Sequence, residues 1–384
     1  MTSEPPQDDR EAIAVPSLGE LALVFLKLGT IAFGGPAAHI ALMENEFVTR
    51  RRWLTRPAFL DRLGAANLLP GPSSTELAIF IGYEKRGLPG LLIAGFCFIV
   101  PAVILVSAIA AGYVRYGGLP QVSGMLYALK PVVIAIVVQA FWNLARTAAK
   151  SRWLAVIGIV AAIAYAAGAH ELLVLLIGAS LAAAPLLASR ARTPMQILLL
   201  AASPFSPAAG AAASSGLGRL FLVFAKTGAL LFGSGYVLLA FLRADLVDRL
   251  GWLTEKQLLD AVAVGQITPG PLFTTATFIG YLIAGPSGAA VATLGIFAPA
   301  FIFVGLSGLV LPRIRRSPIA SAMLDGVVIG SLALMAVVAW QLGRSAIIDL
   351  PTLLIALIST ALLLRFRINS AWLIAAAAII GWLR

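Results

Sequence analysis

Cysteine, histidine and charged residues are all scarce in this sequence. Cys97 is the only cysteine, so the chain has no disulfide framework and no thiolate metal site. His39 and His170 are the only histidines, and they lie far apart without the spacing of a ligating pair. These absences argue against a metal or haem redox enzyme, and we expect no cofactor.

The shortage of charge defines the class of protein. Charged residues make up 12% of the 384 residues and hydrophobic residues 60%, whereas a soluble domain has about 25% charged residues. The apolar residues fall in runs of about 20, the length of a helix that crosses a bilayer. The sequence therefore predicts an all-α polytopic membrane protein. Basic loops beside the membrane explain the formal net charge of +11, and we expect no nucleic-acid partner.

The second half of the chain repeats the first. Pro-Gly-Pro occurs at 70–72 and at 269–271, an offset of 199 residues that also aligns the Trp-Leu-Thr at 53–55 with that at 252–254. The chain is therefore a tandem duplication. The acidic N-terminal segment lacks the features of a cleavable signal. We expect a disordered tail at 1–17, a first membrane repeat at 18–190, a linker at 191–215 and a second membrane repeat at 216–384.

The basic residues indicate how each half crosses the bilayer. If all six apolar segments of the first half crossed, the thirteen Lys and Arg residues in its loops would divide six against seven. If the Pro-Gly-Pro segment enters and returns on one side, twelve lie together and only Arg115 lies opposite, as the positive-inside rule favours. This interpretation predicts about five spanning helices and one re-entrant hairpin in each half. The odd number of crossings inverts the second half, an arrangement typical of secondary transporters.

The Pro-Gly-Pro breaks predict the centre of a binding site. Proline removes a backbone donor and glycine permits unusual conformations, so one short helix ends and another begins at each break. Such backbone is tolerated at membrane depth only where protein buries it or a wet cavity adjoins it. A helix start with nearby hydroxyls suits an oxyanion, although a kink filled by neighbouring helices is the structural alternative. The candidate substrate-binding residues at the two breaks are Pro70, Gly71, Pro72, Ser74, Thr75, Pro269, Gly270, Pro271, Thr274 and Thr275.

The first apolar segment of each half carries further candidates. Gly34, Gly35 and Pro36 interrupt one copy and Gly233 begins the interruption in the other, either to line the same cavity or to allow close helix packing. Lysines occupy equivalent positions in these segments, at 27 and 226. A lysine near the bilayer centre costs about 2.5–3.5 kcal/mol, so we expect Lys27 and Lys226 to attract an anion, with snorkelling as the alternative.

Three polar residues near the breaks complete the candidate set. Glu76 follows the first break, and its counterpart in the second half is uncharged. A lone acid there is either a proton carrier or a salt-bridge partner, and both interpretations stay open. Asn67 and Gln266 correspond under the offset of 199. They would either hydrogen-bond the substrate or satisfy backbone groups freed by the prolines.

Three stretches of the chain resemble the chromate ion transporter family in its long, two-half form. They are FGGPAAHIALMENEFVTRRRWL at 33–54, LLPGPSSTELAIFIGY at 68–83 and ITPGPLFTTATFIGYLIAG at 267–285. The resemblance implies a secondary transporter that exports chromate from the bacterial cytoplasm across the inner membrane, with sulfate as a structural analogue. It places residues 34–36, 70–72 and 74–76 on the family's motif positions. Ser73 and Phe80 depart from the family, which often has Asn and His there.

Two other functions stay open. One is a carrier of sulfate or another oxyanion for which chromate is an accidental passenger. The other is a membrane-embedded enzyme acting on a lipid phosphate, which would need a catalytic base or a metal cluster. The isolated histidines and sparse intramembrane acids argue against that enzyme, and we expect a transporter. Proton coupling and a homodimer are compatible with the sequence and are not settled by it.

Overall fold

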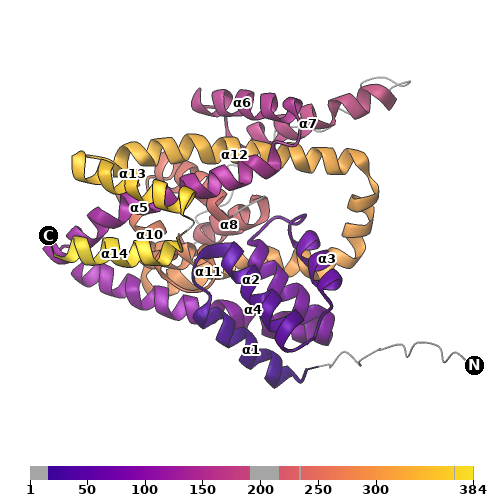
Figure 1. The fold of residues 1–384 in the computed structure, drawn as a ribbon, viewed down its shortest axis with the longest axis horizontal. Coiled ribbons are helices and arrows are strands. Elements are labelled where there is room, and N and C mark those ends of the chain that lie inside the picture. Colours follow the sequence, from indigo (N-terminus) through magenta and orange to yellow (C-terminus); the bar gives the residue numbers. More distant parts are fainter. Residues whose placement is uncertain (1–15, 191–215, 233–234, 367, 384) are drawn as a thin grey trace, which may run out of the picture.

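The computed structural model of the chain describes residues 16–190, 216–232, 235–366 and 368–383. These residues form helices and short connections, with no strand among them (Figure 1). The expected linker at 191–215, most of the expected tail at 1–17 and Gly233 lie outside the described residues. The all-α fold is confirmed.

The α-helices and the π-helix of the first half recur in the same order in the second half, which also contains two short 3₁₀ helices. The first half comprises α1 (Leu18–Ile31), α2 (Gly35–Glu44), the π-helix η1 (Asn45–Arg50), α3 (Arg56–Ala66), α4 (Ser73–Tyr116), α5 (Pro120–Ala148), α6 (Arg152–Ala166) and α7 (Glu171–Arg190). The second half comprises α8 (Gly216–Leu230), the 3₁₀ helix η2 (Gly235–Val237), α9 (Leu238–Leu242), the π-helix η3 (Arg243–Arg249), α10 (Glu255–Ile267), the 3₁₀ helix η4 (Leu272–Thr274), α11 (Thr275–Arg316), α12 (Pro318–Ala346), α13 (Leu350–Arg365) and α14 (Ser370–Trp382).

Equivalent helices of the two halves run in opposite directions. Helices α5 and α12 each have 29 residues and correspond at an offset of 198. Lys150, just past the end of α5, places its Nζ 2.7 Å from Asp325 Oδ1 near the start of α12. Ile134, earlier in α5, packs beside Gly343 near the end of α12. The pair is therefore antiparallel, which confirms the inverted repeat.

The long helices α4 and α11 each contain a sharp reversal. The backbone leaves the helical conformation at Arg86–Gly87 in α4 and at Ala284–Gly285 in α11. Beyond the first reversal the chain comes back so closely that a Cβ on Gly82 would lie 2.3 Å from the carbonyl oxygen of Gly90. Each long helix is therefore a short arm followed by a longer helix that runs back.

The Pro-Gly-Pro segment of the first half forms a helical hairpin. Helix α3 leads to the break, and the short arm of α4 returns beside it, with Arg62 Nε 2.7 Å from Glu84 Oε2. Lys85, at the end of this arm, donates to the carbonyl oxygen of Trp53, which lies before α3 begins. The two ends of the hairpin thus lie together, as a re-entrant segment requires. Its depth in the bilayer stays a prediction.

The first apolar segment also doubles back, where a single spanning helix was expected. Glu20 near the start of α1 pairs with Arg51 after η1, with Oε1 and Nη1 2.5 Å apart. The rings of Phe25 and Phe47 pack with centroids 5.2 Å apart. Helix α1 ends before two glycines with positive φ and has 14 residues, or about 21 Å at 1.5 Å per residue. That length is short of the ~30 Å hydrocarbon core.

Fewer helices are long enough to span than the expected five in each half. Among the described residues, five are long and apolar enough to cross a membrane: α4, α5, α7 as far as Ala188, α11 and α12. Three of the other expected spans, α6, α13 and α14, are apolar helices of only 10–17 residues. The remaining ones are divided by glycines and turns into shorter helices. Helices α6 and α7 pack on α12, and α13 and α14 pack on α5 (Figure 1). Each of these pairs therefore covers a long helix of the other half.

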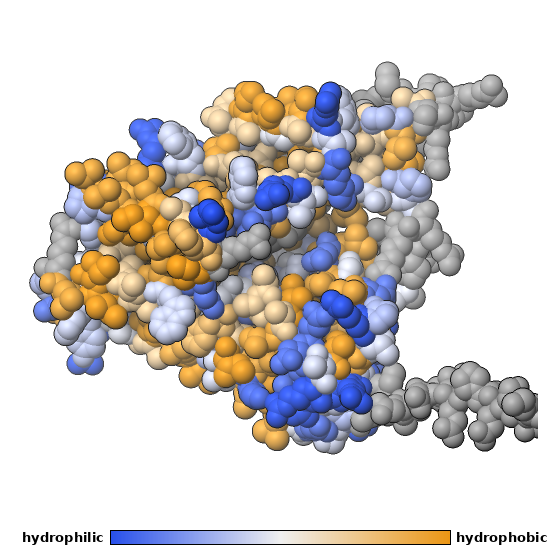
Figure 2. Space-filling view, in the orientation of Figure 1, coloured by the Kyte–Doolittle hydropathy of each residue, from blue (hydrophilic) through white to orange (hydrophobic). Residues whose placement is uncertain are grey.

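The surface suits contact with lipid. Figure 2 shows apolar side chains over the left of the molecule, around α13 and α14, and hydrophilic ones at the lower right, where α1 begins. The side chains of Trp340, Trp372 and Leu383 are 70%, 73% and 74% exposed. Large exposed aromatic and aliphatic side chains are expected where lipid replaces water.

The inverted arrangement predicts opposite accessibility for equivalent turns. We expect single cysteines at Lys150→Cys and Ile348→Cys, in a Cys97→Ser background, to react from opposite faces of sealed vesicles. The two positions differ by 198 residues and lie in exposed turns after α5 and after α12. A membrane-impermeant thiol reagent applied to right-side-out and inverted vesicles checks this. Labelling of both cysteines from one side would contradict the inversion.

Candidate functional site

The four breaks of the two halves meet through a reciprocal pair of backbone hydrogen bonds. Gly71 in the first Pro-Gly-Pro donates its N–H to the carbonyl oxygen of Leu231 at 2.7 Å. Gly270 in the second Pro-Gly-Pro donates to the carbonyl oxygen of Ala32 at 2.9 Å. Both donors and both acceptors are related by the offset of 199, so the pseudo-two-fold axis passes between these bonds. The structure thus brings the candidate residues at the breaks together.

Gly71 is required by the conformation of the first break. Its φ is +142°, a region that favours glycine, and a Cβ there would lie 2.7 Å from Glu76 Oε1. Pro72 then caps α4, which begins at Ser73 as the sequence predicts. The first N–H groups of a helix lack partners within it and carry its positive dipole end. The break therefore presents donors and a buried carboxyl at one point.

Polar atoms at this helix start are buried and unsatisfied. Ser74, Thr75 and Glu76 are 3%, 0% and 0% exposed. Neither carboxyl oxygen of Glu76, nor the hydroxyl of Thr75, has a hydrogen-bond partner within the described part of the chain. An unpartnered buried polar group costs about 1–3 kcal/mol, more if it is charged, so such groups usually mark a functional site.

His39, which the sequence analysis set aside, joins this cluster. Its ring is 1% exposed, with Nδ1 3.1 Å from Ser74 Oγ and Nε2 3.1 Å from the carbonyl oxygen of Ala32. That carbonyl also accepts the N–H of Gly270, so His39 contacts the junction between the halves. Metal-ligand spacing does not identify this residue, because the two histidines lie far apart in the sequence. The informative signal was a lone imidazole four residues after the Gly-Gly break of an apolar segment.

The second break is built differently. A 3₁₀ turn, η4, precedes α11, which begins at Thr275. The hydroxyls of Thr274 and Thr275 donate to the carbonyl oxygens of Pro271 and Leu272, each at 2.8 Å. These two hydroxyl protons are therefore engaged within the local turn. The polar cluster belongs to the first half.

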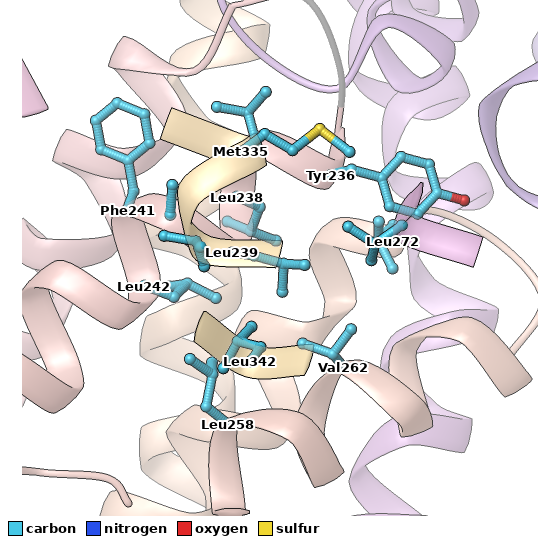
Figure 3. Packing of buried hydrophobic residues seen from close by; sticks show 14 of the residues in the cluster. Tyr236, Leu238, Leu239, Phe241, Leu242, Leu258, Val262, Leu272, Met335 and Leu342 are labelled. Carbon is cyan, nitrogen blue, oxygen red and sulfur yellow. The ribbon is translucent and has the colours of Figure 1, made fainter. Parts of the chain in front are cut away.

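Two residues of the second half reach across to the Gly34–Gly35 break of the first half. A Cβ on Gly35 would lie 3.2 Å from the hydroxyl of Tyr236, and one on Gly34 would lie 3.4 Å from Asn369 Oδ1. Figure 3 shows Tyr236 at the edge of the aliphatic cluster around Leu272, with its hydroxyl directed toward the first-half helices. Tyr236 shares a hydrogen bond with Gln266.

The other amide candidate, Asn67, is placed differently from Gln266. Asn67 is exposed at the end of α3, where its N–H continues the helical bonding to Leu63. Gln266 lies near the second break and contacts the Tyr236 hydroxyl. The two amides, equivalent in sequence, thus have unlike surroundings. Gln266 is the better placed to contact a ligand at the junction.

The two candidate lysines also differ. Lys226 Nζ lies 2.6 Å from Asp245 Oδ2 and 3.7 Å from Glu171 Oε1, so carboxylates already balance its charge. Lys27 is exposed on α1. The acid near it is Glu46: burial opposes its ionisation, yet hydrogen bonds from Arg51 and Arg50 hold the pKa of Glu46 below its usual value. Anion attraction by either lysine stays a prediction.

Two cavities lie at opposite ends of the molecule. The larger, of about 830 Å³, is lined by Asp61, Arg62, Ala65, Phe80, Tyr83, Glu84, Gly87, Ser307, Gly308 and Leu311. Phe80 lies one helical turn after Glu76, so this cavity approaches the buried carboxyl. The smaller, of about 400 Å³, includes Asp260, the counterpart of Asp61. There Asp260 pairs with Lys130 at 3.0 Å and accepts the Tyr113 hydroxyl at 2.8 Å.

The described residues offer no metal centre: no three His, Cys, Asp or Glu side chains among them are placed to hold an ion. The site is instead assembled from backbone donors, hydroxyls, one imidazole and one carboxyl. Such groups bind an oxyanion by hydrogen bonds and can exchange protons with it.

Comparison with known proteins gives the family. The model described as "Chromate transporter" matches residues 19–184 and 218–382. The chain belongs to the chromate transporter family. A chromate transport protein of Cupriavidus metallidurans is 33% identical over 99% of this chain and 98% of the relative. A probable chromate transport protein of Synechococcus elongatus is 33% identical over 89% of each chain.

A third relative is similarly close. A chromate transport protein of Pseudomonas aeruginosa is 32% identical over 97% of this chain and 94% of its own length. No solved structure matches the chain significantly. The names of these relatives agree with the expectation of a transporter in the chromate transporter family.

The buried carboxylates beside Lys226 predict that Arg249, which pairs with them, contributes more to the stability of the protein than its equivalent Arg50. Arg249 pairs with Glu171 and Asp245, which are 1% and 6% exposed, whereas its equivalent Arg50 is 59% exposed and pairs with Glu46. We expect Arg249→Met to lower the free energy of unfolding by about 2 kcal/mol, since it leaves two buried carboxylates underpaired. Arg50→Met should cost about 0.5 kcal/mol or less. Chemical unfolding in detergent measures both, and equal losses would contradict this role.

Proposed function

We propose that this protein exports chromate from the cytoplasm across the bacterial inner membrane. Membership of the chromate transporter family supports the proposal, as does the naming of three full-length relatives as chromate transport proteins. The observation that carries it in the structure is the reciprocal contact of two inverted breaks beside the unsatisfied start of α4. Midplane breaks in inverted repeats are where secondary transporters bind their substrates.

The start of α4 is the proposed anion site. The backbone N–H groups of Ser73 and Ser74 and the unpartnered hydroxyl of Thr75 supply donors to a tetrahedral oxyanion, whereas the N–H groups of Thr75 and Glu76 bond the carbonyl oxygen of Pro72. The Ser74 hydroxyl, which contacts His39, is a further donor once it turns from the imidazole. The remaining candidates at the breaks would shape this site rather than contribute charge. These are Gly34, Gly35, Pro36, Pro70, Gly71, Pro72, Pro269, Gly270 and Pro271.

The two cavities support alternating access to this site. The larger cavity lies at the end of the molecule where the first-half hairpins open, and Arg62 lines it. The basic turn at 50–52 lies at this same end, because Lys85, beside the cavity-lining Glu84, donates to the carbonyl oxygen of Trp53 just after the turn. The positive-inside rule assigns such an end to the cytoplasm. The structure then corresponds to a state whose larger cavity faces the interior.

The membrane potential alone can drive export of a dianion. An ion of charge −2 that leaves a cell with a negative interior gains about 4.6 kcal/mol per 100 mV. At about 1.4 kcal/mol per tenfold, this supports a gradient on the order of 10³. Export therefore does not require protons, whereas uptake of the same ion against this potential does.

If export is driven by a proton gradient in addition to the membrane potential, Glu76 is the proposed proton carrier. No salt bridge joins Glu76 to any described residue, which argues against its alternative role as the partner of a nearby Lys or Arg. A buried carboxyl without a cation is favoured in its neutral form. Such a group can release a proton when a cavity opens to it.

Sulfate is the alternative substrate, because the same donors fit any tetrahedral dianion. Chromate and sulfate are distinguished by competition in one assay. If sulfate is carried faster than chromate in the same direction, the protein is a sulfate carrier that also accepts chromate.

The break at Gly71 provides the test of the site. We expect Gly71→Ala to reduce chromate flux into inverted vesicles at least tenfold, because the added methyl group meets Glu76 and strains the backbone. Gly112→Ala is the matched control, since a Cβ there meets nothing within 4 Å and its flux should stay at the wild-type level. Equal flux in the two variants, at equal protein content, would overturn the proposed site.

Glu76 is tested separately from the anion site. We expect Glu76→Gln to transport chromate under a membrane potential while losing the additional flux that an imposed proton gradient gives the wild-type protein. The amide keeps the size of the carboxyl but cannot exchange a proton. Flux that still responds to the proton gradient would assign coupling to another group.

A further inference from the structure

The two partners of His39 determine which ring nitrogen carries its proton. The carbonyl oxygen of Ala32 can only accept, so Nε2 carries a hydrogen and donates it over 3.1 Å. In a neutral imidazole Nδ1 is then an acceptor, so the Ser74 hydroxyl donates to it, also over 3.1 Å. In this state the single hydroxyl proton of Ser74 is directed to His39. Ser74 therefore cannot donate it to an anion at the start of α4.

Protonation of His39 reverses the polarity of this contact. The imidazolium donates from both nitrogens, so Nδ1–H is directed to Ser74 Oγ while the bond to Ala32 is kept. Ser74 then accepts from His39, and its hydroxyl proton is free to turn toward a bound oxyanion. One proton taken up from the bulk solvent or its buffer thus adds a positive charge and releases one donor.

We propose that His39 is a positioning residue whose protonation accompanies oxyanion binding and turns the Ser74 hydroxyl from the imidazole to the anion. The proposal rests on the proposed anion site at the start of α4. At that site it makes the binding of a dianion by the Ser74 hydroxyl depend on the uptake of a proton by His39. We call this pair of residues the proton-linked selector.

The surroundings of His39 contain few other titratable groups. On α4, Glu76 lies two residues after Ser74, with its carboxyl directed to Gly71. The ring of Phe98, also on α4, packs edge to face with the imidazole, and the two ring centroids are 5.8 Å apart. On η2, the Tyr236 hydroxyl lies beside Gly35 at the start of α2. On α1, the nearest ionisable side chain in sequence to Ala32 is Lys27, which is exposed. An ionised Glu76 would favour the imidazolium, so its contribution has to be measured separately.

The second half lacks this arrangement. The offset of 199 places Leu238 where His39 stands and Phe273 where Ser74 stands, and both side chains are buried and apolar. The carbonyl of Leu231 accepts from Gly71 as Ala32 accepts from Gly270, but without an imidazole beside it. The pseudo-symmetric scaffold therefore carries the proposed selector on one side only.

The test uses the full-length protein with sulfate as the probe, because sulfate remains a dianion across the pH range of the assay. We expect the sulfate affinity of the wild-type protein to rise as pH falls, with a slope approaching tenfold per pH unit on the alkaline side, as one linked proton requires. His39→Asn keeps a polar group near the Nδ1 position but does not titrate. Its sulfate affinity should change less than twofold over the same range, and Ser74→Ala should flatten the profile as well.

A second measurement does not depend on any variant. Addition of sulfate to weakly buffered wild-type protein should take up close to one proton per anion bound. Loss of this uptake in Glu76→Gln, with sulfate still bound, would assign the proton to Glu76 and overturn the role of His39. Absence of uptake in the wild-type protein, or a wild-type slope in His39→Asn, would overturn the role of His39. Absence of both sulfate and chromate binding in the wild-type protein would instead overturn the proposed function.

Discussion

Two backbone hydrogen bonds hold the centre of this fold together. Gly71 to Leu231 and Gly270 to Ala32 join each Pro-Gly-Pro break to the first break of the other half. Backbone N–H and C=O groups in hydrocarbon must be hydrogen-bonded within the protein. A chain that interrupts its own helices four times leaves several of these groups without a bond inside a helix. In the inverted duplication, each half supplies the carbonyl oxygen that accepts the N–H group of a break in the other half. The breaks are therefore stable only as a set, and neither half could maintain them alone.

Symmetry in the backbone coexists with asymmetry in the side chains. Glycines, prolines and helix lengths repeat between the halves, because they determine the path of the chain. The residues that bear protons do not: His39, Ser74 and Glu76 correspond to Leu238, Phe273 and Thr275. The buried acids Glu171 and Asp245, conversely, are paired with cations in the second half. One half thus carries the chemistry, and the other closes the scaffold around it.

The sequence predicted what depends on local signals and composition. Apolar runs identified the membrane class, and the offset of Pro70 from Pro269 identified the duplication. The inversion was predicted from the basic turns through a count of five crossings in each half, although the doubling back of the first segment removes one of those five. The doubling back of the first segment was missed, because Gly34 and Gly35 were interpreted as an interruption within one span. The role of His39 was also missed, since its partners, Ser74 and the carbonyl of Ala32, become neighbours only when the hairpins fold together.

The exchange of short helices between the halves has a mechanical consequence. Helices α13 and α14 lie on α5, while α6 and α7 lie on α12, so each repeat is wrapped by part of the other. Two bodies interlocked in this way cannot rock apart along the boundary of the duplication. Movement that opens one cavity and closes the other must instead displace helical hairpins against a frame of long helices drawn from both copies. The unit that was duplicated and the unit that moves are then different parts of the molecule.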